Sequence, residues 1–153
     1  MLDAIQADAS RELLSFRLGS QEFSIDVMAV REIRGWTPET PLPHAPSFVR
    51  GVVNLRGAVI PIVDLADRLG LPPSGATPQS VIIVTQVGAQ LVGLLVTAVC
   101  DILNADANAI QPTPEIASGP TRAYVQGLLT VEHRMIGVLR TDQLFPALEP
   151  EPA

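Results

Sequence analysis

Short segments that alternate apolar and polar side chains fill most of the chain, and each ends at a glycine, a proline or a polar turn. This alternation is typical of β-strands with one buried face. Strands are predicted at 11–18, 22–26, 30–36, 51–55, 58–63, 80–87, 90–96, 99–103, 125–131 and 135–139. Short helices are predicted only from Asp64 to Leu69 and from Thr141 or Asp142 to Phe145. The pattern therefore predicts an all-β fold, in which short strands close into small antiparallel barrels.

One turn stands out among the loops. Arg56 and Gly57 alone separate the apolar runs 51–55 and 58–63, which is the spacing of a two-residue hairpin. Gly57 allows a positive φ there, although arginine is unusual at the first position of such a turn. Longer loops are expected where prolines gather, at 37–46, 70–78 and 111–120.

The second half of the chain resembles the first. A shift of 69 residues places Gly19 on Gly88 and Glu32 on Asp101, and a shift of 76 places Gly51 on Gly127. Chance similarity between strand-turn-strand segments is the alternative. The repeat predicts two lobes over about 11–72 and 79–147, with strand exchange between them allowed. An N-terminal extension over 1–10 and a tail over 148–153 complete this division.

The charge and length of the chain exclude several classes of partner. Its 153 residues carry a net charge of −6, and all ten basic residues are arginines, so nucleic acid and anionic membranes are poor partners. The most apolar run, 91–100, is too short to span a bilayer, which needs about 20 residues. The N-terminus lacks a secretion signal, so a cytoplasmic location without membrane insertion is expected.

Residues that could perform catalysis are sparse. His44 lies in the first proline loop and His133 in a predicted turn, and we interpret both as exposed turn residues. Cys100 fits a small buried side chain on a strand; as a nucleophile it would need an orienting histidine and an unusually reactive thiolate. No phosphate-binding loop or metal-ligand spacing is present in the sequence. We therefore expect no enzyme, no cofactor and no metal.

Charged residues on the apolar strands offer a different function. Arg31, Glu32 and Arg34 alternate within one strand, which for any single residue is compatible with a solvated face. Arg56 differs, because a tight turn would present its planar guanidinium to carboxylates or carbonyls of a partner. Trp36 could cover the edge of a lobe or anchor a contact.

The segment VREIRGWTPETPLPHAPSFVRGVVNLRGAVIPIVDL, residues 30–65, closely resembles the CheW family of chemotaxis coupling proteins. The pieces FSIDVMAVREI, FVRGVVNLRG and AVIPIVDL follow the order and spacing of that family. A weaker likeness continues through VGLLVTAVCDIL and YVQGLLTVEHRMIGVLRTDQL, so the resemblance covers Leu14 to Leu144. It implies two packed SH3-like barrels of five strands each, with short helices and no catalysis.

The resemblance also implies partners and contact residues. Proteins of this kind join the cytoplasmic tips of methyl-accepting chemoreceptors to the regulatory, CheW-like domain of the CheA histidine kinase, and self-association in receptor arrays is compatible with it. By position, the receptor-facing residues would be Val30, Glu32, Gly51, Arg56 and Ile102. Candidates for the kinase surface are Val27, Val30, Val52, Val53 and Leu55. The resemblance further predicts an ion pair between Glu32 and Arg56.

One residue departs from the family pattern, and two other classes of protein compete with this interpretation. Thr97 stands where relatives commonly carry an acid. A CheW-like domain of a kinase, or one fused to a receiver domain, is disfavoured by the length of 153 residues. A nucleic-acid-binding barrel would need a basic face and exposed aromatics, whereas aromatic residues are 4% of this chain.

Overall fold

The computed structural model describes residues 10–72, 75–112 and 123–141. Within them, the first half of the chain forms β1 (Ser10–Leu18), β2 (Gln21–Asp26), the 3₁₀ turn η1 (Val27–Ala29), β3 (Val30–Gly35), β4 (Val49–Leu55), β5 (Ala58–Asp64) and the helix α2 (Leu65–Arg68). The second half forms β6 (Val81–Val87), β7 (Gln90–Val96), β8 (Ala98–Asp106), the 3₁₀ turn η2 (Ala107–Ala109), β9 (Gln111–Pro112), β10 (Val125–Val131) and β11 (Arg134–Leu139). The predicted all-β class is confirmed.

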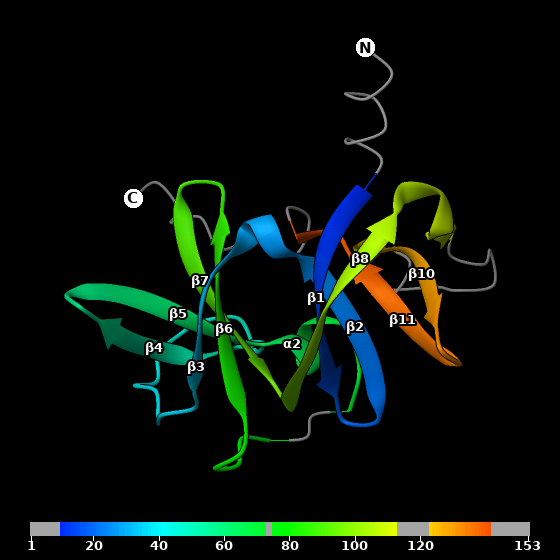
Figure 1. Cartoon of the computed structure of the whole chain (residues 1–153). Coiled ribbons are helices and arrows are strands. Elements are labelled where there is room, and N and C mark those ends of the chain that lie inside the picture. Colours follow the sequence, from blue (N-terminus) through cyan, green and yellow to red (C-terminus); the bar gives the residue numbers. More distant parts are fainter. Residues whose placement is uncertain (1–9, 73–74, 113–122, 142–153) are drawn as a thin grey trace.

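The strands form two sheets that lie on either side of α2 (Figure 1). One sheet has the order β8-β1-β2-β11-β10-β9, and the other has the order β3-β6-β7-β5-β4. The expected five strands per lobe hold for the second sheet. The first sheet has a sixth because Gln111–Pro112, predicted as part of a loop, pairs with β10 at its edge.

Each sheet takes strands from both halves of the sequence, so the sheets do not follow the ranges 11–72 and 79–147 in succession. The hairpin β1–β2 joins the sheet of β8, β10 and β11, while β6–β7 joins that of β3, β4 and β5. The parallel pairings repeat in register. Ser24 of β2 pairs with Val138 of β11, and Gly93 of β7 pairs with Ile62 of β5. The equivalent residues differ by the two shifts found in the sequence, since 93 − 24 = 69 and 138 − 62 = 76. The two halves of the chain thus exchange a hairpin, and the strand pairing around the exchanged hairpin is the same in both lobes.

The core follows from strand alternation, because neighbouring residues on a strand point to opposite faces. Leu14 and Phe16 of β1 join Ile83 and Leu94 of the other sheet in a buried cluster shared by both sheets and α2. Leu13, one residue away, points into a second cluster made by the six-stranded sheet alone. A third cluster belongs to the five-stranded sheet. No helix among the described residues has the length and apolar character needed to cross a membrane.

Local predictions agree with the structure in most places. Asp64 caps α2 by accepting a hydrogen bond from the Asp67 N–H at 3.3 Å, although the helix ends at Arg68. The strand predicted at 99–103 extends to Asp106, since it pairs with β1 as far as Ser10. The two 3₁₀ turns were not predicted, and the helix expected to end at Phe145 lies outside the described residues.

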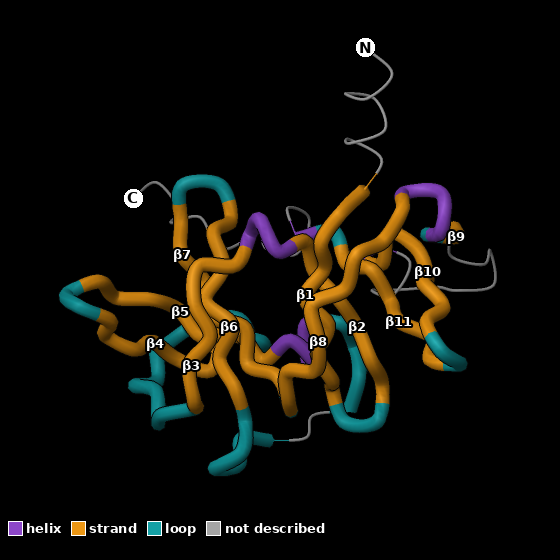
Figure 2. Tube along the Cα trace, viewed as in Figure 1, coloured by secondary structure: helices purple, strands orange, loops and turns teal. Residues whose placement is uncertain are grey.

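Arg68 of α2 lies between aromatic rings from both halves of the chain. Its guanidinium carbon is 4.5 Å from the centre of the Phe48 ring and 4.8 Å from that of Tyr124. The two rings occupy equivalent positions, since 124 − 48 = 76, and both pack on the shared cluster. Figure 2 shows the helix between the two sheets. The cation–π contacts of Arg68 therefore connect the lobes directly.

We predict that Arg68→Ala lowers the free energy of unfolding by about 1–3 kcal/mol, because two partly desolvated cation–π contacts are lost. Arg68→Lys should lose less because it keeps the positive charge near the rings, but it should still lose some stability, since an ammonium cannot stack on both rings as a planar group does. Urea denaturation measures both variants. An unchanged midpoint for Arg68→Ala would show that the rings pack equally well without the cation.

Candidate functional site

The turn between β4 and β5 has the geometry that the hairpin prediction requires. Arg56 and Gly57 have φ angles of 50° and 88°, so both central residues are left-handed, as in a type I′ turn. The Asn54 carboxamide oxygen accepts a hydrogen bond from the Gly57 N–H at 3.0 Å and closes the turn. The positive φ predicted for Gly57 is confirmed. The turn carries the Arg56 side chain, which is 72% exposed.

Arg56 forms the predicted ion pair with Glu32 of β3, through its Nη2 atom and the Glu32 Oε1 atom. The second carboxylate oxygen of Glu32 accepts from Arg34 at 3.4 Å. β3 and β4 are the two ends of the five-stranded sheet, so the sheet curls enough for side chains to bridge its ends. We call Glu32, Arg34 and Arg56 the Glu32 cluster.

The charges of the Glu32 cluster reinforce each other. The hydrogen bond from Arg56 lowers the pKa of Glu32, against the opposing effect of burial, and the positive charges of Arg56 and Arg34 lower it further. The same hydrogen bond and the charge of Glu32 raise the pKa of Arg56. Both groups are therefore ionised at neutral pH, and a partner would meet an oriented guanidinium.

Gly51 allows the proline loop to lie directly on β4. Thr40 and Val52 exchange two backbone hydrogen bonds of 2.8 Å each, which brings the loop against the strand. A Cβ on Gly51 would lie 2.3 Å from the Thr40 carbonyl oxygen, and its φ of +153° is strained for other residues. Gly51 is buried, so its side of the strand is occupied by the loop.

An ion pair holds the same loop one residue before Thr40, between Glu39 and Arg50. The Glu39 side chain is 8% exposed and accepts from Arg50 and from the Trp36 indole, each at 3.1 Å. Burial raises the pKa of Glu39, but hydrogen bonds from Arg50 and Trp36, with the charge of Arg50, lower it overall. Trp36 packs on the cluster of the five-stranded sheet, so it covers the edge of that lobe.

The other predicted receptor residues lie on the edge strands. Val30 of β3 is half-buried against the shared cluster. Ile102 of β8 is 62% exposed and belongs to the six-stranded sheet. The structure thus brings Glu32 and Arg56 into contact, places Gly51 beneath the proline loop, and puts Ile102 on the edge of the other sheet.

The predicted kinase residues differ in exposure. Val27 of η1 and Val30 are half-buried against the shared cluster, and Val52 and Val53 of β4 are also half-buried. Leu55 is buried in the cluster of the five-stranded sheet, so its side chain supports the strand from within.

Several contacts were not predicted from the sequence. Arg34 bonds Glu32 because residues two apart on a strand share a face, a signal present in the alternating charges. Glu39 gave no signal, since its partners come from other segments. Thr97, which departs from the family pattern, accepts a hydrogen bond from the Gly19 N–H at 2.9 Å and so supports the turn between β1 and β2.

The residues considered for catalysis do not form a reactive centre. Burial, with the charge of Glu22, raises the pKa of the Cys100 thiol, which disfavours the thiolate. His44 and His133 are exposed at positive φ angles in turns, as predicted. Within residues 10–72, 75–112 and 123–141, no group of three His, Cys, Asp or Glu side chains could hold a metal ion.

Two equivalent β-lobes with a charged cluster at a hairpin tip define a protein-interaction module of the SH3-like type. The CheW-like domain family matches residues 12–149, and the chain belongs to this family. Chemotaxis protein CheW of Rhizobium meliloti is 55% identical over 146 residues, which are 95% of this chain and 94% of the relative. CheW of Klebsiella aerogenes is 35% identical over 139 residues, with 91% and 84% covered.

A solved structure agrees with these relatives. The crystal structure of the scaffolding protein TtCheW from Thermoanaerobacter tengcongensis matches with a TM-score of 0.82 and 31% identity, over 93% of this chain and 97% of that one. The resemblance found in the sequence is confirmed, and the chain is a chemotaxis coupling adaptor.

We predict that Gly51→Ala lowers the free energy of unfolding by about 2 kcal/mol or more, because the new Cβ collides with the Thr40 backbone in a strained φ region. Gly35→Ala is the matched control, since a Cβ there meets nothing within 4 Å. Thermal and urea denaturation compare the two. Equal stability of the variants would show that the proline loop does not depend on close packing at Gly51.

We also predict that the pKa of Glu32 in the folded protein lies below 4.5 and rises in Arg56→Ala. Because folding lowers this pKa, the stabilisation from the pair is complete above the unfolded pKa and is lost as pH falls through the folded one. NMR titration of the Glu32 carboxyl carbon measures it. Arg31→Ala should leave the pKa lowered, since Arg31 donates to the Met28 carbonyl at 3.1 Å.

Proposed function

We propose that this chain couples methyl-accepting chemoreceptors to the CheA histidine kinase, so that receptor signals control kinase autophosphorylation. The observation that carries the proposal is the Arg56 guanidinium, which is exposed on a rigid turn and oriented by Glu32. Family membership supports the choice of partners, and the description of TtCheW as a scaffolding protein supports a non-catalytic role. No cofactor is needed for such coupling.

The receptor site is proposed to contain Val30, Glu32, Gly51, Arg56 and Ile102. Arg56 would donate hydrogen bonds to carboxylates or carbonyls of the receptor tip, while Glu32 keeps the guanidinium in place. The exposed Ile102 would add apolar contact area. Gly51 would act indirectly, by letting the proline loop pack against β4.

The kinase surface is proposed to use Val27, Val30, Val52 and Val53, with Leu55 supporting β4 from the core. Half-buried valines offer apolar contact at low entropy cost, because their β-branched side chains are already restricted. The regulatory domain of CheA is the proposed partner. Each interface would bury roughly 600–800 Å² per partner, which is the range of small to standard protein–protein interfaces.

Coupling of this kind needs two sites on one rigid body. An adaptor transmits a signal only if its contacts differ in free energy between the two states of the partners. Rigid sheets keep the two surfaces in a constant relation, so a shift at the receptor reaches the kinase. We place the protein in the cytoplasm at receptor arrays, where copies of it would also associate with one another.

Arg56→Ala should abolish most of the receptor-dependent stimulation of the kinase and weaken receptor binding about tenfold to thirtyfold, as loss of a central arginine anchor does. The assay adds purified protein to receptor-bearing membranes and CheA and measures autophosphorylation. Arg31→Ala is the matched control, because this exposed arginine of β3 does not bond Glu32. No stimulation by the wild type would exclude the proposed coupling of these receptors to CheA, and full stimulation by Arg56→Ala would remove Arg56 from the site.

A further inference from the structure

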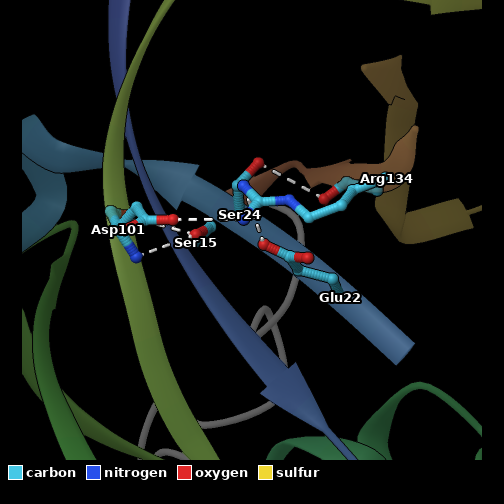
Figure 3. Close-up of polar contacts among 6 residues, drawn as sticks. Ser15, Glu22, Ser24, Asp101 and Arg134 are labelled. Carbon is cyan, nitrogen blue, oxygen red and sulfur yellow. Dashed lines mark hydrogen bonds and ion pairs between the residues drawn. The ribbon is translucent and has the colours of Figure 1, made fainter. Parts of the chain in front are cut away.

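A polar cluster lies within the six-stranded sheet (Figure 3), and most of the equivalent positions in the other lobe carry apolar residues or glycine. Its members come from four strands, and they are Ser15, Glu22, Ser24, Asp101 and Arg134. The positions 69 residues beyond Ser15, Glu22 and Ser24 carry Val84, Leu91 and Gly93. The same backbone framework therefore accepts apolar residues or glycine at these three positions, so the fold does not require Ser15, Glu22 and Ser24 to be polar.

The Ser15 side chain replaces backbone hydrogen bonds that are missing where the pairing of β1 with β8 is interrupted. Leu14 pairs with Ile102 and Phe16 with Val99, so Cys100 and Asp101 oppose Ser15 alone, as in a β-bulge. The Ser15 hydroxyl donates to the Asp101 carbonyl at 3.3 Å and accepts from the Asp101 N–H at 3.1 Å. One side chain thus satisfies both backbone groups of the residue that precedes Ile102.

Arg134 of β11 holds the side chain of the same residue. Its Nη1 donates to Asp101 Oδ2 at 3.2 Å, and its Nη2 lies 3.5 Å from Glu22 Oε2 on β2. The Glu22 side chain is only 14% exposed. Arg134 therefore links the edge strand β8 to the centre of the sheet across β1.

The cluster contributes less to stability than its contacts suggest. Glu22 Oε2 and Arg134 Nε and Nη2 are buried and form no hydrogen bond. Buried charges that are only partly satisfied lose hydration without full compensation, and apolar replacements are often neutral or stabilising. The cluster does not create the bulge, because the ladder between β3 and β6 shifts at the equivalent place, between Val30 and Glu32, opposite Val84. What the cluster does is link Asp101 of β8 to β1 and β11.

The Glu32 cluster and the polar cluster around Arg134 occupy related places in the two lobes but differ in exposure. Asp101 corresponds to Glu32, since 101 − 32 = 69, and each acid on an edge strand pairs with an arginine of the β-hairpin in its own sheet. Arg56 is 72% exposed, whereas Arg134 is 36% exposed and engages two acids. One arginine is available to a partner, and the other is held within the protein.

We propose that Arg134 is a positioning residue: with Ser15 and Glu22 it holds Asp101 in place within the bulge of β8, and so fixes the position of Ile102 in the receptor site. This inference rests on the proposed function, which assigns Ile102 to that site. Arg134 need not touch the receptor. It acts through Asp101, the neighbour of Ile102.

The test uses the full chain with Glu22→Leu and Arg134→Met combined, which leaves the net charge unchanged and makes residue 22 resemble Leu91. We expect an unchanged denaturation midpoint and unchanged CheA binding, but receptor affinity lower by about twofold to thirtyfold. Amide exchange at Asp101 and Ile102 should become faster, and Arg134→Lys alone should retain most of the affinity.

Ser15→Ala gives a second route should the double variant fold poorly. It removes only the hydroxyl that bonds Asp101, and Ser24→Ala is its matched control, because Ser24 bonds the Gly137 carbonyl at 3.3 Å and not β8. We expect weaker receptor binding for Ser15→Ala and normal binding for Ser24→Ala.

Arg56→Ala and Ile102→Ala, measured in parallel, separate this inference from the function on which it rests. If these two weaken receptor binding and the double variant and Ser15→Ala do not, the positioning role is overturned while the receptor site stands. If Arg56→Ala and Ile102→Ala bind normally, the receptor site is wrong and the positioning role falls with it.

Discussion

The exchange of the hairpins β1–β2 and β6–β7 between the two sheets is the constraint on which the rest of the structure depends. Each hairpin pairs on both sides with strands of the opposite half, antiparallel with β8 or β3 and parallel with β11 or β5. Neither half can complete a sheet alone, and the shared cluster needs side chains from both. The two lobes therefore fold as one rigid body, which an adaptor that holds two partners at once requires.

Because the backbone repeats so closely, differences between the lobes identify side chains with tasks other than folding. Val84 and Leu91 place apolar side chains in one lobe and Gly93 places none, whereas Ser15, Glu22 and Ser24 occupy the matching positions in the other. Gly51 and Gly127 are alike, since a Cβ on each would strike a backbone carbonyl oxygen, of Thr40 and Gln111 respectively. Shared glycines follow from the architecture, whereas the unshared polar residues are not required by it.

Most of the fold could be predicted from the sequence because alternation and turn chemistry are local signals. The turn at Arg56 and Gly57, the cap at Asp64 and nearly all strand positions follow from them. The strand partners do not, since pairing across the repeat depends on contacts between distant segments. The Glu32 and Arg56 pair came from resemblance to a family, whereas the cluster around Arg134 required coordinates, because its members are spread from Ser15 to Arg134.

The exposed and the buried ion pairs of this protein serve different ends. An exposed pair such as that of Arg56 adds little to stability, because solvent screens it, but the paired acid restricts the guanidinium before a partner arrives and so lowers the entropy cost of binding. The Glu39 carboxylate is satisfied by Arg50 and Trp36 and holds the proline loop in place. A residue that must recognise a partner needs donors that the partner can reach, and the Arg56 side chain is 72% exposed whereas those of Arg50 and Arg134 are 27% and 36% exposed. Exposure and orientation together therefore support the proposal that Arg56 is the recognition residue.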